Sequence, residues 1–111
     1  MTAMTTIDQR CADILAPATE LLAATISAGF NQTGIPSALK AARELRAVLA
    51  QGTDGISSDT YLDWHATADG MLESIIRELE EGEPVTARKI LTDPRLGLHK
   101  LTIACAGMPG W

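Results

Sequence analysis

Residues 58–82 read SDTYLDWHATADGMLESIIRELEEG, and their apolar side chains recur at the spacing of an α-helix. Six side chains, four or three residues apart, fall on one line of such a helix: Tyr61, His65, Ala68, Leu72, Ile75 and Leu79. A hydroxyl at Ser57 or Ser58 can accept from the unpaired first-turn N–H groups. Gly82 followed by Pro84 is typical of a helix end. The stretch therefore predicts one long amphipathic helix over 58–82, around which the chain is organised.

The apolar arc of this helix is wide, roughly 180°, with Trp64 and Met71 at one edge and Leu62 and Ile76 at the other. A single neighbouring layer needs an arc of only about 100°. The remaining cover could come from the chain's own helices, from a second copy or from another protein. We predict that the arc exceeds what one copy can hide.

The charge of the same stretch is one-sided. Residues 59–83 hold eight acidic side chains against Arg77 alone, a net charge of −7, whereas the whole chain carries −5. Acids at the C-terminal end of a helix oppose its dipole, and three stand there: Glu78, Glu80 and Glu81. Such a cluster is typical of a solvated face that keeps a protein soluble, or of a surface that meets a basic partner.

The length fits one domain, residues 1–111, and the scarcity of aromatic residues indicates a core of aliphatic side chains and alanine. No window has the ~18 consecutive apolar residues of a membrane span, and the first residues lack the pattern of a signal peptide. We therefore expect a cytoplasmic protein. Cys11 and Cys105 lie on apolar faces, and in a reducing compartment they are expected to be buried thiols rather than a bridge.

The flanking segments also have helical signals. Thr6 followed by Gln9 fits a capping box at the start of a first helix, in which Pro17 predicts either a kink or a division into two helices. A second helix is expected over 36–51, with a basic outer face. The acidic pI, near 4.8, argues against non-specific nucleic-acid binding.

After the central helix, residues 84–92 predict a short helix, whereas 97–106 fit a helix better than a strand, because a strand would have no partner in the chain. Residues 84–111 carry a net charge of +3 and are expected beside the −7 helix. Residues 107–111 form a flexible tail in this interpretation, and Trp111 is either a tethered core plug or an exposed contact.

The chemistry-bearing residues do not form a recognisable catalytic set. His65 and Asp69, four residues apart, could make a metal pair or an oriented base, but a zinc site needs three or four ligands and the chain has no HExxH or CxxC motif. A half-buried histidine bonded to a carboxylate is the favoured interpretation. We therefore expect no catalytic, cofactor or metal site.

Residues 60–85 contain Tyr61-Leu62-Asp63, Trp64-His65-Ala66, Met71-Leu72 and Ile75-Ile76, followed by Gly82 and Pro84-Val85. This stretch is similar to small bacterial antiactivators of LuxR-type quorum-sensing receptors. This resemblance implies a dimeric helical protein that binds a transcription factor and blocks its dimerisation or its contact with DNA.

Together these patterns predict an all-α bundle of four to five helices and a cytosolic protein-interaction module, a homodimer whose partner is another protein. The resemblance implies that this partner is a LuxR-type factor. We expect neither direct nucleic-acid nor membrane binding. The expected contact residues are Tyr61, Trp64, Met71, Leu72, Ile75, Glu78, Glu80, Glu81 and Trp111. Two alternatives remain: a small enzyme or ligand-binding bundle that uses His65 and Asp69, and an acidic DNA mimic.

Overall fold

The computed structural model describes residues 5–111, which form five α-helices and one short 3-10 helix and contain no strand. The elements are α1 (Ile7–Phe30), η1 (Gln32–Gly34), α2 (Ile35–Leu49), α3 (Asp59–Glu80), α4 (Pro84–Leu91) and α5 (His99–Ala104). The all-α fold predicted from the sequence is confirmed.

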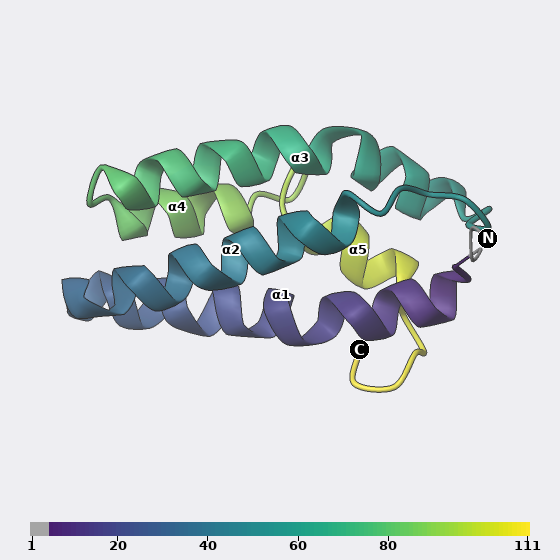
Figure 1. Ribbon diagram of the computed structural model, residues 1–111, viewed down its shortest axis with the longest axis horizontal. Helices are drawn as coiled ribbons and strands as arrows, with labels where there is room; N and C mark the ends of the chain where they lie inside the picture. Colours follow the sequence, from purple (N-terminus) through teal and green to yellow (C-terminus); the bar gives the residue numbers. More distant parts are fainter. Residues whose placement is uncertain (1–4) are drawn as a thin grey trace.

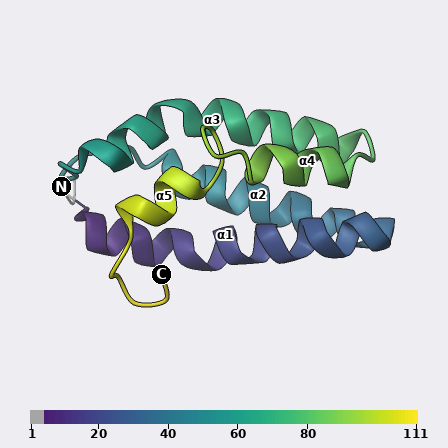
Figure 2. The same cartoon turned by 180° about the vertical axis from the view of Figure 1, so that it is seen from behind.

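Three long helices and two short ones make the bundle. α1, α2 and α3 run side by side along the molecule, and α4 and α5 follow one another along the remaining side (Figures 1 and 2). α4 packs against α1 and α3, and α5 packs against α3. The two short helices together take the place of the fourth helix of a bundle, which puts the basic segment beside acidic α3 as expected.

Local chemistry explains where the helices begin and end. The Ser58 hydroxyl accepts from the Tyr61 N–H at 3.3 Å, so Ser58 rather than Ser57 caps α3. Gly82, with φ +78°, adopts the left-handed conformation just after α3. Thr6 caps α1 by accepting from the Gln9 N–H at 3.2 Å. α1 continues through the buried Pro17 as a single helix, because the surrounding packing outweighs the lost hydrogen bond.

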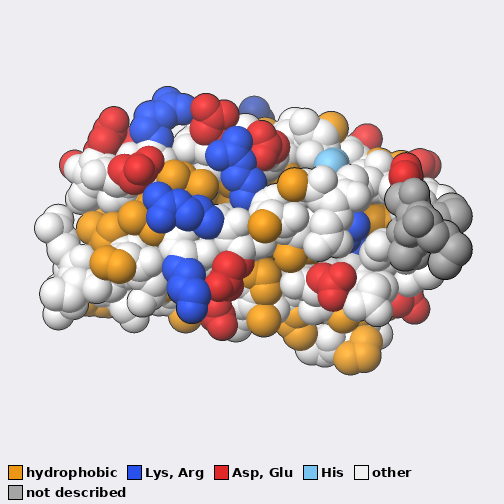
Figure 3. Space-filling view, viewed as in Figure 1, with side chains coloured by type: hydrophobic (Ala, Val, Ile, Leu, Met, Phe, Trp, Pro, Cys, Tyr) orange, Lys and Arg blue, Asp and Glu red, His pale blue; other side chains and the backbone are white. Residues whose placement is uncertain are grey.

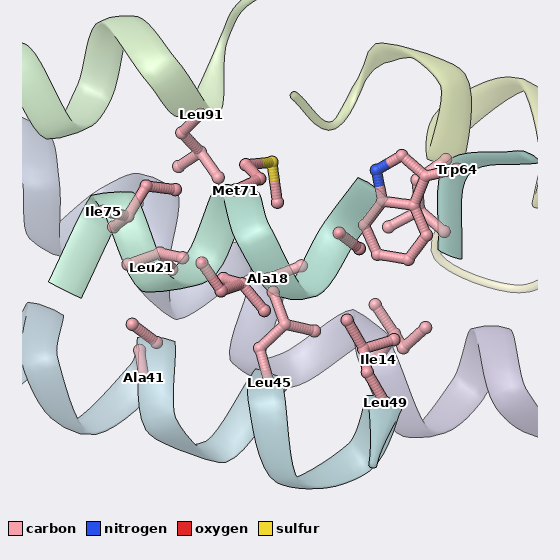
Figure 4. Packing of buried hydrophobic residues seen from close by; sticks show 14 of the residues in the cluster. Ile14, Ala18, Leu21, Ala41, Leu45, Leu49, Trp64, Met71, Ile75 and Leu91 are labelled. Carbon is pink, nitrogen blue, oxygen red and sulfur yellow. The ribbon is translucent and has the colours of Figure 1, made fainter. Parts of the chain in front are cut away.

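The apolar arc of α3 is covered by the chain's own helices. In Figure 4, Trp64, Met71 and Ile75 lie between side chains of α1, α2 and α4. All five predicted apolar anchors expose no more than 5% of their surface: Tyr61, Trp64, Met71, Leu72 and Ile75. The prediction that one copy cannot cover these five side chains is therefore wrong, whereas their role in a protein contact stays a prediction that their burial weighs against. A wide arc indicates cover from several directions, and here α1, α2, α4 and α5 supply most of it, with Leu62 and Ile76 at one edge left half-buried.

The segment between α4 and α5 is anchored at Gly97. The indole Nε1 of Trp64 donates to the Gly97 carbonyl at 3.0 Å inside the core, and the Gly97 N–H donates to the Asp93 carbonyl at 2.8 Å. A Cβ at this position would collide with the backbone of Leu91. Residues 99–104 are helical, which agrees with the favoured interpretation of 97–106, although α5 is short.

A disulfide joins Cys11 of α1 to Cys105, the residue after α5. The two Cα atoms are 5.8 Å apart although 94 residues separate them in sequence, and both side chains are fully buried. The expectation of two free thiols is therefore wrong, because the position of α5 brings Cys105 next to Cys11 near the start of α1. Disulfides persist mostly in oxidising compartments, so this bond weighs against the cytoplasmic location, which stays a prediction.

The last residues fold back onto α1. The Trp111 indole Nε1 donates to the Cys11 carbonyl at 3.0 Å, and the side chain is half-buried. Gly110, with φ +86°, lies against Leu15 so closely that a Cβ would meet that side chain. Of the two alternatives for Trp111, the structure therefore shows the docked one.

Candidate protein-interaction surface

The acidic side chains predicted to steer a partner lie at the C-terminal end of α3, and they are not equivalent. Glu80 forms an ion pair of 3.8 Å with Arg43 of α2. Glu81 is exposed, and Glu78 is half-buried. Glu83, in the turn that follows α3, is also exposed. Three acids at this end therefore remain outside the ion pairs found among residues 5–111.

The basic outer face of α2 neutralises part of α3. Arg46 binds Asp69 through two hydrogen bonds of 2.8 and 3.2 Å, and side chains of both signs lie close together over α2 and α3 (Figure 3). The hydrogen bonds from the Arg46 guanidinium, which hold the carboxylate ionised, lower the pKa of Asp69 below its ordinary value. Asp69 and Glu80 are thereby paired with α2, whereas Glu78, Glu81 and Glu83 are not.

His65 and Asp69 are occupied separately. The His65 Nε2 lies 3.0 Å from the Leu49 carbonyl at the end of α2, whereas Asp69 binds Arg46. Both line a hollow of about 270 Å³, but residues 5–111 hold no group of three or more side chains placed to bind a metal. The expected hydrogen bond from the histidine to a carboxylate is replaced by one to a backbone carbonyl.

A buried arginine is the most unusual polar group in the core. Arg10, 1% exposed, donates from Nη1 to the Gly52 carbonyl and lies 3.4 Å from the Tyr61 hydroxyl. Its Nε has no hydrogen-bond partner, and no carboxylate of residues 5–111 lies within ion-pair distance. Burial raises the pKa of Tyr61, and the neighbouring guanidinium opposes part of that rise. Through Gly52 and Tyr61 the guanidinium ties α1 to the loop after α2 and to the start of α3, which is a structural role.

The exposed apolar residues, which the sequence did not single out, are concentrated in one place. Six large apolar side chains are exposed in residues 5–111, and four of them lie on α1 and at the start of α4: Leu22, Ile26, Phe30 and Val85. We call these four the α1–α4 surface. Phe30 exposes 91% of its surface. A Cβ built on Gly29 would stand 3.7 Å from Val85, so the two helices are in close contact here.

This surface adjoins the acidic end of α3. The end of α1 and the turn between α3 and α4 lie at the same end of the bundle (Figures 1 and 2). The Gln32 side chain donates to the Gly82 carbonyl at 3.3 Å, which ties the segment after α1 to that turn. Glu78, Glu81 and Glu83, which we call the acidic rim, therefore lie at the same end of the bundle as Phe30 and Val85.

The apolar side of α1 continues toward its N-terminus. A hollow of about 510 Å³ lies there, lined mainly by small and apolar residues: Ala12, Leu15, Ala16, Thr19, Glu20 and Gly110. By length and composition α1 could cross a membrane, a property shared by core helices of soluble proteins and by signal sequences. Only 39% of its most apolar window is buried inside the fold. α1 thus carries more apolar surface than the bundle covers.

The comparisons with protein-family models, with curated proteins and with solved structures find no match for this chain.

Proposed function

We propose that this protein is a small interaction module that acts by covering a surface of another protein through the α1–α4 surface. The observation that carries the proposal is the concentration of exposed apolar side chains there, next to an acidic rim. Single exposed apolar residues are ordinary on protein surfaces, but a contiguous group with a polar border is typical of an interaction site.

The proposal moves the contact from the middle of α3 to α1 and α4. Phe30 becomes the central anchor, because a nearly fully exposed aromatic ring gains most from burial in a partner's pocket. Glu78 and Glu81, two of the acids predicted to steer a partner, keep that role as part of the rim.

The resemblance over residues 60–85 supports a more specific version of the proposal. That range includes the end of α3 and Val85, and it suggests a transcription factor of the LuxR type as the partner. The module would then inhibit the factor by covering its dimerisation or DNA-binding surface. A gel-shift assay with a purified LuxR-type receptor tests this version: we expect the protein to release the receptor from its DNA, and the Phe30→Ser variant to fail.

The general proposal is tested by site-specific photo-crosslinking in the native host. A photoreactive phenylalanine analogue at position 30 is compared with the same analogue at position 103. Ile103 is a suitable control, because it is 56% exposed but lies on α5, outside the α1–α4 surface. We expect a discrete crosslinked species from position 30 and none of the same mass from position 103. Equal crosslinking at both positions would contradict the proposal.

A further inference from the structure

We infer that the α1–α4 surface binds a basic amphipathic helix of a partner protein, laid along the outer side of α1. The inference rests on the proposed function and names the chemistry of the partner. It follows from the spacing of the exposed side chains, from the charge around them and from the effect of that charge on the other possible occupants.

The spacing of the exposed residues suits a helix as the partner. Leu22, Ile26 and Phe30 are each four residues apart, so they form a line about 12 Å long on α1. Leu15, seven residues before Leu22, lies on the same side, but Gly110 packs against it, so the exposed line begins at Leu22. The length of the line matches about two turns of a partner helix, whose apolar side chains would recur every three or four residues.

The charge around this line is acidic. The sequence has no lysine or arginine between Arg10 and Lys40, and it has two acids there, Asp13 and Glu20. Arg10 itself is buried. The last turn of α1 holds no basic side chain, so the negative end of its helix dipole is not offset within that turn. A partner segment gains from lysine or arginine beside its apolar stripe.

The acidic rim extends the same charge beyond the end of α1. Glu78, Glu81 and Glu83 lie at the same end of the bundle as Phe30 and Val85. The two cations of α4, Arg88 and Lys89, follow Val85 by three and four residues, so they lie one turn along that helix and offset part of this charge, but the three acids outnumber them. The charge complement of this surface is basic.

The same charges argue against two other occupants. In a symmetric dimer that used this patch, both copies would bring the same acidic charge to one interface, and like charges at an interface are unfavourable. An anionic lipid surface would be repelled by the same acids, because such surfaces attract basic segments. A basic helix is the occupant that suits both the apolar line and the rim.

The inference can be tested with synthetic peptides. Three labelled 18-residue probes are titrated with the purified protein by fluorescence anisotropy at low salt: a Leu/Lys amphipathic helix, the same helix with Glu in place of Lys, and a Leu/Lys peptide with scrambled order. We expect measurable binding of the first probe only. Raising the salt from 50 to 500 mM should weaken that binding, because the attraction involves exposed charges.

Matched variants locate the contact. Phe30→Ser should weaken binding of the Leu/Lys helix by about thirtyfold, the size of a hot-spot effect, whereas Ile103→Ser should change it less than about twofold, within the range of a neutral site. Because Phe30 is so exposed, its replacement should leave the thermal melt by circular dichroism unchanged. The double variant Glu81→Lys/Glu83→Lys should weaken binding and reduce its salt dependence.

Three results would overturn the inference: equal binding of the acidic and basic helices, no effect of Phe30→Ser on the Leu/Lys helix, or a dimer in sedimentation that Phe30→Ser dissolves. If any of these occurs while position 30 still crosslinks to a protein in the host, the proposed function stands and only the partner's chemistry is wrong. If position 30 and position 103 also crosslink alike, both proposals fail.

Discussion

Replacing the disulfide should remove a large part of the stability of this fold. The bond joins two cysteines that are 94 positions apart in the sequence. In the chain-entropy treatment, closing a loop of that length lowers the entropy of the unfolded chain and raises its free energy by about 4.7 kcal/mol at 25 °C. Domains of this size have a free energy of unfolding of about 5–15 kcal/mol, so the loss is a third or more of the total. At about 2.1 cal/mol/K per residue, it corresponds to a fall in Tm of about 20 °C.

The assay is urea denaturation followed by circular dichroism, on the wild-type protein and on the Cys11→Ala/Cys105→Ala variant. Wild-type protein that has been reduced in denaturant and refolded with a phosphine reductant serves as the control, because it keeps both sulfur atoms in the core. We expect both reduced forms to lose about 4–5 kcal/mol relative to the oxidised protein, and the alanine variant to lose more, since each buried sulfur it lacks leaves space unfilled.

A loss smaller than about 1 kcal/mol in the reduced wild-type protein would refute this reasoning. It would mean that α5 stays docked through the Trp64–Gly97 hydrogen bond and the packing of Leu101 alone. Two free thiols in the denatured, unreduced protein, measured with a thiol reagent, would refute the disulfide itself and restore the expectation of buried thiols.

Three further predictions concern single side chains. Gly70→Ala should raise the free energy of unfolding by about 0.5–1 kcal/mol, because Gly70 lies within α3 and an added methyl group would meet nothing within 4 Å. Gly97→Ala should lower the free energy of unfolding by far more, because its methyl group would collide with the backbone of Leu91. Thermal melts of the two variants measure both effects. Arg10→Met should leave the free energy of unfolding within about 1 kcal/mol of wild type or raise it, since a buried cation without a carboxylate partner is costly. If urea denaturation shows that the free energy of unfolding falls by more than about 3 kcal/mol, the cation is compensated in the folded state. Arg46 lowers the pKa of Asp69 in the folded state, so the stabilisation by Asp69 is present above its ordinary pKa of about 3.9 and is lost as the pH falls through the lowered value. In urea titrations from pH 7 to pH 2, the free energies of unfolding of wild type and Asp69→Asn should therefore become equal at low pH.

The boundaries of α3 could be predicted because they depend on local chemistry. A hydroxyl that caps the first turn and a glycine that adopts positive φ act within four residues of the helix ends, and Ser58 and Gly82 do so here. The disulfide could not be predicted in the same way. It depends on where α5 packs, and two cysteines 94 residues apart give no local sign that their sulfur atoms meet.

Surplus apolar surface was expected on α3, and it lies on α1 instead, because an apolar arc does not show which neighbours cover it. α3 touches α2, α4 and α5, so its wide arc is covered from several directions, whereas α1 has α2 and α4 as its main neighbours. The buried residues of α1, such as Ile14 and Leu21, use the side that faces them. Leu22, Ile26 and Phe30 repeat every four residues on another side, within a stretch that has no cation. The idea that surplus apolar surface indicates a partner is therefore retained, but the surplus lies on α1, on a side that α2 and α4 do not cover.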